Sequence, residues 1–166
     1  MDNGKILYSK DDQLYFIKMS GDLRFTLGRE FDNLLNIIFC DPEVQDVMID
    51  LREAEYLDST ILGLLAKIAN FMIKKFQKKA LILSVNENIN YLLENIGLSD
   101  VFTLVKDGDT PESLKNLPET DRNGWKEALT ILDAHRQLVN MNEKNRAAFK
   151  DVVELLEKET REKINS

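Results

Sequence analysis

Two short apolar runs, separated by one helix-length segment, constrain the fold of this chain more than any other feature. Residues 47–51 and 80–85 are almost entirely apolar, which is typical of strands covered on both faces. Between them, apolar side chains recur at helical spacing from Leu62 to Phe76. This order of strand, helix and strand favours α/β layers.

The segments on either side continue the same alternation. Residues 20–22, Ser-Gly-Asp, are expected to break a strand, and Gly97 is expected to end a helix in the left-handed conformation. We predict further strands at residues 6–8, 14–19 and 101–105, and helices at residues 27–39 and 88–95. The predicted fold class is therefore α/β, a mixed β-sheet with helices packed on it.

The composition changes after Lys106, where Gly, Pro and acidic residues predict a linker. We expect a first domain at residues 1–106, a linker at 107–122 and a C-terminal helical extension at 123–166. The extension is one long helix or two helices separated near Asn142. Its apolar stripe, which includes Trp125, Leu129 and Leu132, must pack on the first domain, on a second copy or on a partner.

Charge and cysteine content exclude several classes of protein. The 166 residues carry a formal net charge of −7, which argues against nonspecific nucleic-acid binding because that needs a basic surface. Cys40 is the one cysteine, so no internal disulfide forms, and we expect a packed thiol. We find no signal-peptide pattern and no apolar run near the ~18 residues of a membrane span. A cytoplasmic location without membrane association is expected.

Asp58, Ser59 and Thr60 lie where the loop after residues 47–51 turns into a helix. Simple capping of the helix by Asp58 or Ser59 would account for these residue types. The alternative is phosphorylation, because a helix start offers unpaired N–H groups and a partial positive charge to a phosphate. A phosphate on Ser59 would make the patch beside Asp58 strongly anionic. Thr60 is the second candidate acceptor.

The chain resembles the STAS domain family, and within it the anti-sigma factor antagonists of bacteria. The resemblance covers about residues 5–105, and its most specific part is Tyr-Leu-Asp-Ser-Thr-Ile-Leu-Gly at residues 56–63. Ser-Gly-Asp-Leu at residues 20–23 and Asn-Ile-Gly-Leu at residues 95–98 also match. The resemblance implies the STAS fold. The C-terminal extension is similar to that of longer gammaproteobacterial antagonists, which link a two-component phosphorelay to motility and biofilm choice.

This resemblance implies partner switching by a protein that is not itself an enzyme. In the family, the serine matching Ser59 is phosphorylated by an anti-sigma factor with serine-kinase activity. A PP2C-type phosphatase, linked to a response regulator in the longer type, removes the phosphate. Only the unphosphorylated form binds the anti-sigma factor and frees the sigma factor. No cofactor, metal or nucleic acid is expected to take part.

The predicted partner-binding residues surround this helix start. They are Asp22, Arg24, Asp58, Ser59, Thr60, Leu62 and Gly63. Ile61 stands where many relatives have glycine, and it favours ordinary helical dihedrals. Arg24 stands where relatives often carry an acidic residue, so it is either a solvated side chain or a partner for a phosphate on Ser59.

Other functions stay open on the sequence alone. A non-switching scaffold, or a small-ligand sensor, would use the same fold, and the C-terminal helices could serve a further effector. The sequence has no Walker-type phosphate loop and no HExxH, GxSxG or GxGxxG motif. His135 is the one histidine, and by itself it cannot build a metal site or a catalytic triad.

Overall fold

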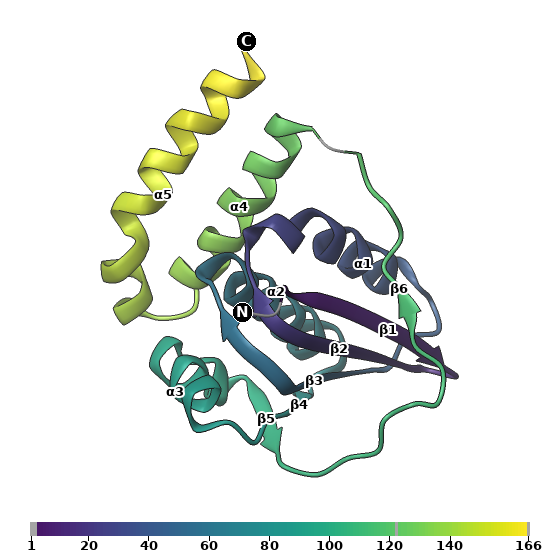
Figure 1. The fold of residues 1–166 in the computed structure, drawn as a ribbon. Helices are drawn as coiled ribbons and strands as arrows, with labels where there is room; N and C mark the ends of the chain where they lie inside the picture. Colours follow the sequence, from purple (N-terminus) through teal and green to yellow (C-terminus); the bar gives the residue numbers. More distant parts are fainter. Residues whose placement is uncertain (1–2, 122, 166) are drawn as a thin grey trace.

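The computed structural model describes residues 3–121 and 123–165, which form one mixed sheet and the helices around it (Figure 1). The strands are β1 (Lys5–Asp11), β2 (Leu14–Leu23), β3 (Asp46–Leu57), β4 (Ala80–Leu83), β5 (Phe102–Val105) and β6 (Lys115–Asn116). The helices are α1 (Gly28–Cys40), α2 (Ser59–Phe76), α3 (Glu87–Ile96), α4 (Gly124–Val139) and α5 (Glu143–Ile164). The predicted α/β class, with helices C-terminal to the sheet, is confirmed.

The sheet has the strand order β5-β4-β3-β2-β1-β6. Strands β2 to β5 run parallel to one another, whereas β1 is antiparallel to both β2 and β6. The parallel strands therefore end at one edge of the sheet, where the loop after β2 and the start of α2 meet. Helices α1 and α2 lie together on one face of the sheet (Figure 1).

The core is built where the apolar runs of neighbouring strands align. Ile17, Ile49 and Ile82 are paired in register across β2, β3 and β4, and each is completely buried. Burying one such side chain contributes about 1.5–3 kcal/mol. The apolar stripes of the flanking helices cover the faces of the sheet. Strands covered in this way are almost entirely apolar, as residues 47–51 and 80–85 are.

Two local predictions were wrong. Strand β2 does not break at residues 20–22 but continues to Leu23, because Gly21 adopts a φ of 73° and the register with β3 shifts beside it. Because of this bulge the pairing with β3 continues past Gly21, and Asp22 remains part of the strand. Cys40 is exposed, since it is the last residue of α1 and lies past the helix's buried stripe.

The segment predicted as a linker contains β6. Its two residues pair with β1 through Leu7 with Asn116 and Tyr8 with Lys115. Leu117, the next residue, packs against the core. The connection to the extension is therefore attached to the edge of the sheet.

The extension consists of two helices, which decides between the two forms considered from the sequence. Asn140 ends α4, and the Asn142 side chain caps α5 by accepting from the N–H of Asn145 at 2.8 Å. Helix α4 packs on α2 and α1, and α5 packs on α4 (Figure 1).

The buried side of α4 differs in part from the predicted stripe. Leu132 is buried, but Trp125 and Leu129 are 40% and 38% exposed. The buried residues of this helix are Ala128, Thr130, Leu132, Ala134, His135 and Leu138. The contact face is therefore centred on small residues and one histidine, with the largest apolar side chains at its margin. No helix within the described residues is long and apolar enough to cross a membrane.

Candidate functional site

Asp58 organises the start of α2 by binding two segments at once. Its Oδ1 accepts from the N–H of Ile61 at 3.0 Å, which caps the helix, and its Oδ2 accepts from the N–H of Phe25 at 2.6 Å. The N–H of Asp58 in turn donates to the carbonyl of Leu23 at 3.0 Å. The loop after β2 and the first turn of α2 are thus held together. This contact brings Asp22 and Arg24 near Ser59, as predicted from the sequence.

Ser59, in the first turn of α2, contacts a residue far away in the sequence. Its Oγ lies 2.8 Å from Nε2 of His135, 76 positions further along the chain. Nδ1 of His135 lies 2.7 Å from the carbonyl oxygen of Ile131, which can only accept. In the neutral imidazole Nδ1 therefore carries the proton, and the Ser59 hydroxyl donates to Nε2.

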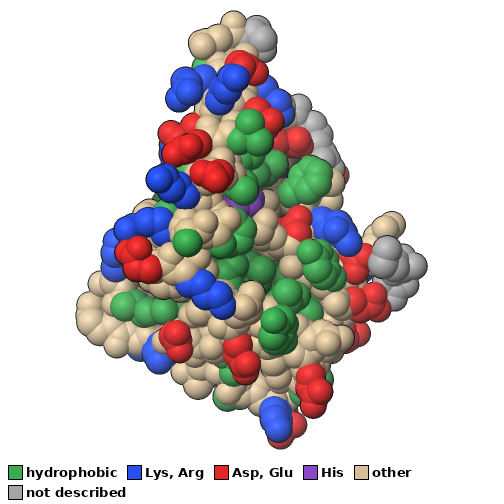
Figure 2. Space-filling model, turned by 90° about the vertical axis from the view of Figure 1, so that its left-hand side faces the viewer, with side chains coloured by type: hydrophobic (Ala, Val, Ile, Leu, Met, Phe, Trp, Pro, Cys, Tyr) green, Lys and Arg blue, Asp and Glu red, His purple; other side chains and the backbone are tan. Residues whose placement is uncertain are grey.

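Contacts at both ring nitrogens and with a neighbouring aromatic ring hold the imidazole of His135 in place. The residue is 5% exposed, and its ring meets the edge of Phe149 from α5 with the ring centroids 5.8 Å apart. Figure 2 shows only a small area of histidine, above a gathering of hydrophobic side chains on this face. Ser59 is partly exposed, so its hydroxyl lies at the margin of the contact between α2 and α4.

The remaining residues predicted on α2 are more deeply buried. Thr60 and Leu62 are 3% and 5% exposed. Gly63 touches the backbone of α4 so closely that a Cβ there would lie 2.8 Å from the Cα of Ala134 and closer still to its carbonyl. Only glycine admits the two helices at this distance.

Asp22 and Arg24 lie beside this helix start, at the end of β2. The guanidinium of Arg24 is 3.7 Å from Oδ2 of Asp22 and 4.7 Å from the centre of the Tyr56 ring. Its charge is directed to these two neighbours. Pairing of Arg24 with a phosphate on Ser59 stays a prediction.

Lys67 joins three helices one turn further along α2. Its Nζ is 2.9 Å from Oδ1 of Asp32 on α1 and 2.9 Å from Oδ2 of Asp133 on α4. Burial by itself lowers the pKa of Lys67, but its hydrogen bonds to Asp32 and Asp133 outweigh this and raise it above the ordinary value. The ammonium therefore stays charged and holds α4 against the sheet domain.

A second attachment lies at the start of α5. Asn145, 2% exposed, donates from Nδ2 to the carbonyl of Ile96 at 2.8 Å. Nζ of Lys144 donates to Oδ1 of Asn95 at 2.8 Å. The first of these bonds satisfies a carbonyl at the C-terminal end of α3, where Gly97 has the predicted left-handed conformation with φ of 90°.

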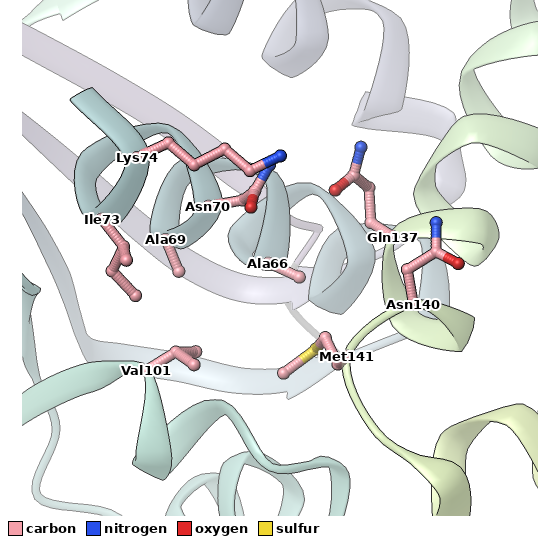
Figure 3. Close-up of a pocket in the computed structure, with 9 residues that line it drawn as sticks. All are labelled: Ala66, Ala69, Asn70, Ile73, Lys74, Val101, Gln137, Asn140 and Met141. Carbon is pink, nitrogen blue, oxygen red and sulfur yellow. The ribbon is translucent and has the colours of Figure 1, made fainter.

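An open pocket of about 560 Å³ lies between α2, α4 and the segment before β5 (Figure 3). Ala66, Ala69 and Ile73 come from α2, and Gln137 comes from α4. Figure 3 shows Val101 and Met141 on the side opposite the amides of Asn70 and Gln137. The described residues contain no group of three or more His, Cys, Asp or Glu side chains placed to hold a metal.

Reasoning from the sequence missed His135, Lys67 and Asn145. The spacing of Ala128, Leu132, His135 and Leu138 places the histidine on the buried side of α4, and a polar residue on such a stripe is the signal that could have identified it. No comparable signal marks Asn145, because its partner is a backbone carbonyl.

Comparison with known proteins gives a consistent result for the first part of the chain. Residues 5–110 match the model of the STAS domain. The anti-sigma-B factor antagonist of Staphylococcus aureus (strain NCTC 8325 / PS 47) is 29% identical over 99 residues, which cover 60% of this chain and 90% of that protein.

Among solved structures, an anti-sigma factor antagonist from Mycobacterium paratuberculosis is similar with a TM-score of 0.51 and 18% identity. The similarity covers 61% of this chain and 85% of that one. At this identity the likeness concerns the fold alone. Helices α4 and α5 lie outside the residues matched to the domain model.

Proposed function

The chain belongs to the STAS domain family, and from this premise we propose that it is an anti-sigma factor antagonist that works by partner switching. The observation that carries the proposal is Ser59, held in the first turn of α2 directly after the Asp58 cap and beside the end of β2. The relative from S. aureus that bears the name anti-sigma-B factor antagonist supports the same function.

In the proposed mechanism the unphosphorylated chain binds an anti-sigma factor at the start of α2. The binding surface comprises Asp22, Arg24, Asp58, Ser59, Thr60, Leu62 and Gly63. Binding occupies the anti-sigma factor and frees the sigma factor. No chemical step by this chain is needed, because its part is to present a surface that changes charge.

Phosphorylation at Ser59 reverses the switch through local electrostatics. The first amides of a helix have no partner inside it, so the helix start itself favours a phosphate at Ser59. The phosphate adds about −1.5 to −2 charges next to Asp58. A partner docked there then meets like charge and a desolvation penalty, and a difference of ~3 kcal/mol weakens binding more than a hundredfold.

The proposed partners follow from the same scheme. They are an anti-sigma factor with serine-kinase activity, which modifies Ser59, and a PP2C-type phosphatase under a response regulator, which restores it. The chain would act in the cytoplasm. Its resemblance to antagonists with a C-terminal extension is the basis for proposing a phosphorelay input and a motility or biofilm output.

A pull-down from cell extract with the full-length variants Ser59→Ala and Ser59→Asp as baits tests the switch. Ser59→Ala should capture the anti-sigma factor, and Ser59→Asp should bind the purified partner at least a hundredfold more weakly in calorimetry. Ser113→Asp adds the same charge at an exposed linker position and should bind like the unmodified chain. Equal affinity of Ser59→Ala and Ser59→Asp would contradict the proposal.

One observation favours a second candidate, a non-switching scaffold. The Ser59 hydroxyl is already bonded to His135, as a constant structural contact would be. A scaffold predicts no phosphorylated form in cells, whatever the growth condition. Phosphate-affinity electrophoresis of the native protein, with Ser59→Ala and Thr60→Val as references for the two hydroxyls, separates the candidates.

A further inference from the structure

Helix α4 occupies part of the surface that the proposed function assigns to the anti-sigma factor. Helix α4 lies along α2 from Ser59, which meets His135, to Lys67, which meets Asp133. Between these contacts Gly63 touches the backbone of Ala134. Three consecutive turns of α2 are therefore in contact with a segment of the same chain.

This contact leaves no space for a second protein. Leu62 is only 5% exposed, and the backbones of α2 and α4 meet at Gly63 without room for a Cβ. A partner that used Gly63 would have to displace α4. Helix α4 and such a partner therefore cannot bind α2 at the same time, for steric reasons that do not depend on charge.

The same contact leaves no space for a phosphate on Oγ of Ser59 in its present position. Oγ lies 2.8 Å from Nε2 of His135, and a phosphoryl group cannot enter a gap of that size. The imidazole cannot easily turn aside, because its Nδ1 is bonded to the carbonyl of Ile131 and its ring makes a T-shaped contact with Phe149. Modification of Ser59 therefore requires this bond to break, with movement of α4 or of the serine side chain.

We propose that α4 and α5 are a docked cover that binds the antagonist surface in cis. While the cover is docked, the chain neither binds an anti-sigma factor nor accepts a phosphate at Ser59. Detachment of α4 is then a separate step that precedes the Ser59 switch. The importance of the covered surface rests on the proposed function, but the docking rests only on the contacts of α4.

Thiol labelling of a full-length chain measures the cover without any partner. The Cys40→Ser, Ser59→Cys chain places one thiol at the margin of the contact with α4, and Cys40 in the unsubstituted chain serves as an exposed reference. We expect a bulky maleimide dye to label Cys40 at least ten times faster than the thiol at position 59. An imidazole beside a thiol raises its reactivity, so slow labelling can only reflect restricted access.

Substitutions on α4 alone then release the cover. Adding Ala134→Leu places a large side chain at a fully buried position of α4, and the labelling rate at position 59 should rise at least tenfold. Gly124→Ala, on the same helix, adds a methyl group where no atom lies within 4 Å and should leave the rate unchanged. Circular dichroism should show that both variants keep the sheet domain folded.

Two results would overturn the cover. One is labelling at position 59 as fast as at Cys40, and the other is an equal rate in the Ala134→Leu and Gly124→Ala chains. Both leave the switch at Ser59 intact, since that depends on the comparison of Ser59→Ala with Ser59→Asp.

The consequence for signalling is measured with the anti-sigma factor captured by the Ser59→Ala bait. Ala134→Leu should bind it at least tenfold more tightly than Gly124→Ala does. Faster labelling with unchanged affinity would refute cis inhibition while still demonstrating a cover.

Discussion

The sheet domain and the C-terminal extension bury their apolar side chains in different ways. In the sheet domain, residues such as Ile17 and Ile49 are enclosed by neighbouring strands and by helices on the faces. The extension has no centre of its own: α4 buries one stripe on α2 and α1, and α5 packs on α4. We therefore expect the first region to be stable alone and the second to depend on the surface that it covers.

This difference separates two kinds of opening. Loss of the sheet core should unfold the whole chain, because every other element rests on it. Loss of the contact between α2 and α4 should free the extension and leave the sheet domain intact. Substitutions in the two regions should therefore differ in the number of segments that they destabilise.

The largest effect is expected from Ile49→Ala in the centre of β3. Removing a fully buried Ile side chain should lower the free energy of unfolding by about 3–4 kcal/mol, since the packed strands cannot close the cavity. Urea denaturation followed by circular dichroism measures this loss. Amides of the sheet and of the extension should lose protection together, and protection lost in one region only would break the comparison.

Leu138→Ala should have the next largest effect, confined to the extension. Leu138 is completely buried against the core, and its truncation should weaken docking of α4 by about 2–3 kcal/mol. Hydrogen exchange should speed up in α4 and α5 while β3 and β4 keep their protection. Leu129→Ala, on the same helix but 38% exposed, is the matched control and should change little.

Asp58→Ala should cost about 1 kcal/mol, the usual value of an N-cap. It removes both the cap on Ile61 and the bond to Phe25, so hydrogen exchange should rise at the start of α2 and in the loop after β2. Asp58→Asn keeps a capping oxygen and should retain most of the stability. A similar loss with both substitutions would show that the charge of Asp58, rather than its geometry, supports the site.

A smaller effect, limited to acid, is expected at the opposite end of the sheet. The Tyr15 hydroxyl donates to Oδ2 of Asp41 at 2.6 Å, and this bond is the main reason why the pKa of Asp41 falls to about 2. Burial, with the same hydrogen bond, raises the pKa of Tyr15 to about 12. A lowered carboxyl pKa stabilises the fold above the unfolded value of about 4, and this contribution is lost as the pH falls towards 2.

Tyr15→Phe should therefore raise the pKa of Asp41 and flatten the loss of stability between pH 4 and pH 2. Urea midpoints at pH 7, 4 and 2.5, with the Asp41 titration followed by NMR, measure both changes. An unchanged acid transition would mean that the acid sensitivity lies elsewhere, for example in the extension.

The smallest effect is expected from Leu155→Ser on the outer side of α5. Leu155 is 57% exposed, so the free energy of unfolding should change by less than about 0.5 kcal/mol. Size-exclusion chromatography should show the same elution volume for both chains. A larger loss of stability, or a change of size, would reveal that this side of α5 is packed against another molecule.

The sheet domain was predictable because its signals are local. The apolar runs at residues 47–51 and 80–85, the helix between them and the cap at Gly97 each depend on neighbouring residues in the sequence. The bulge at Gly21 and strand β6 were missed, since each depends on a distant strand that supplies the register or the pairing.

The candidate site was predictable only in its first half. Asp58, Ser59 and Thr60 indicate the start of a helix because side chains of these types commonly cap helices. The contact of Ser59 with His135 joins positions 76 residues apart, and no local pattern specifies which surface the stripe of α4 covers. The sequence indicated that the stripe needed a partner, and packing decided that the partner was α2.

Strand β6 has a consequence for competition between the cover and any protein in solution. Lys115 and Asn116 are paired with β1 in the sheet. The connection from the sheet to α4 is therefore only the short stretch between Asn116 and Gly124. A detached α4 would stay close to α2, at an effective concentration on the millimolar scale for a short tether. A binding partner must compete with α4 at that effective concentration. Lengthening this stretch with Gly and Ser would lower the effective concentration and so raise the apparent affinity for the partner, without altering either surface.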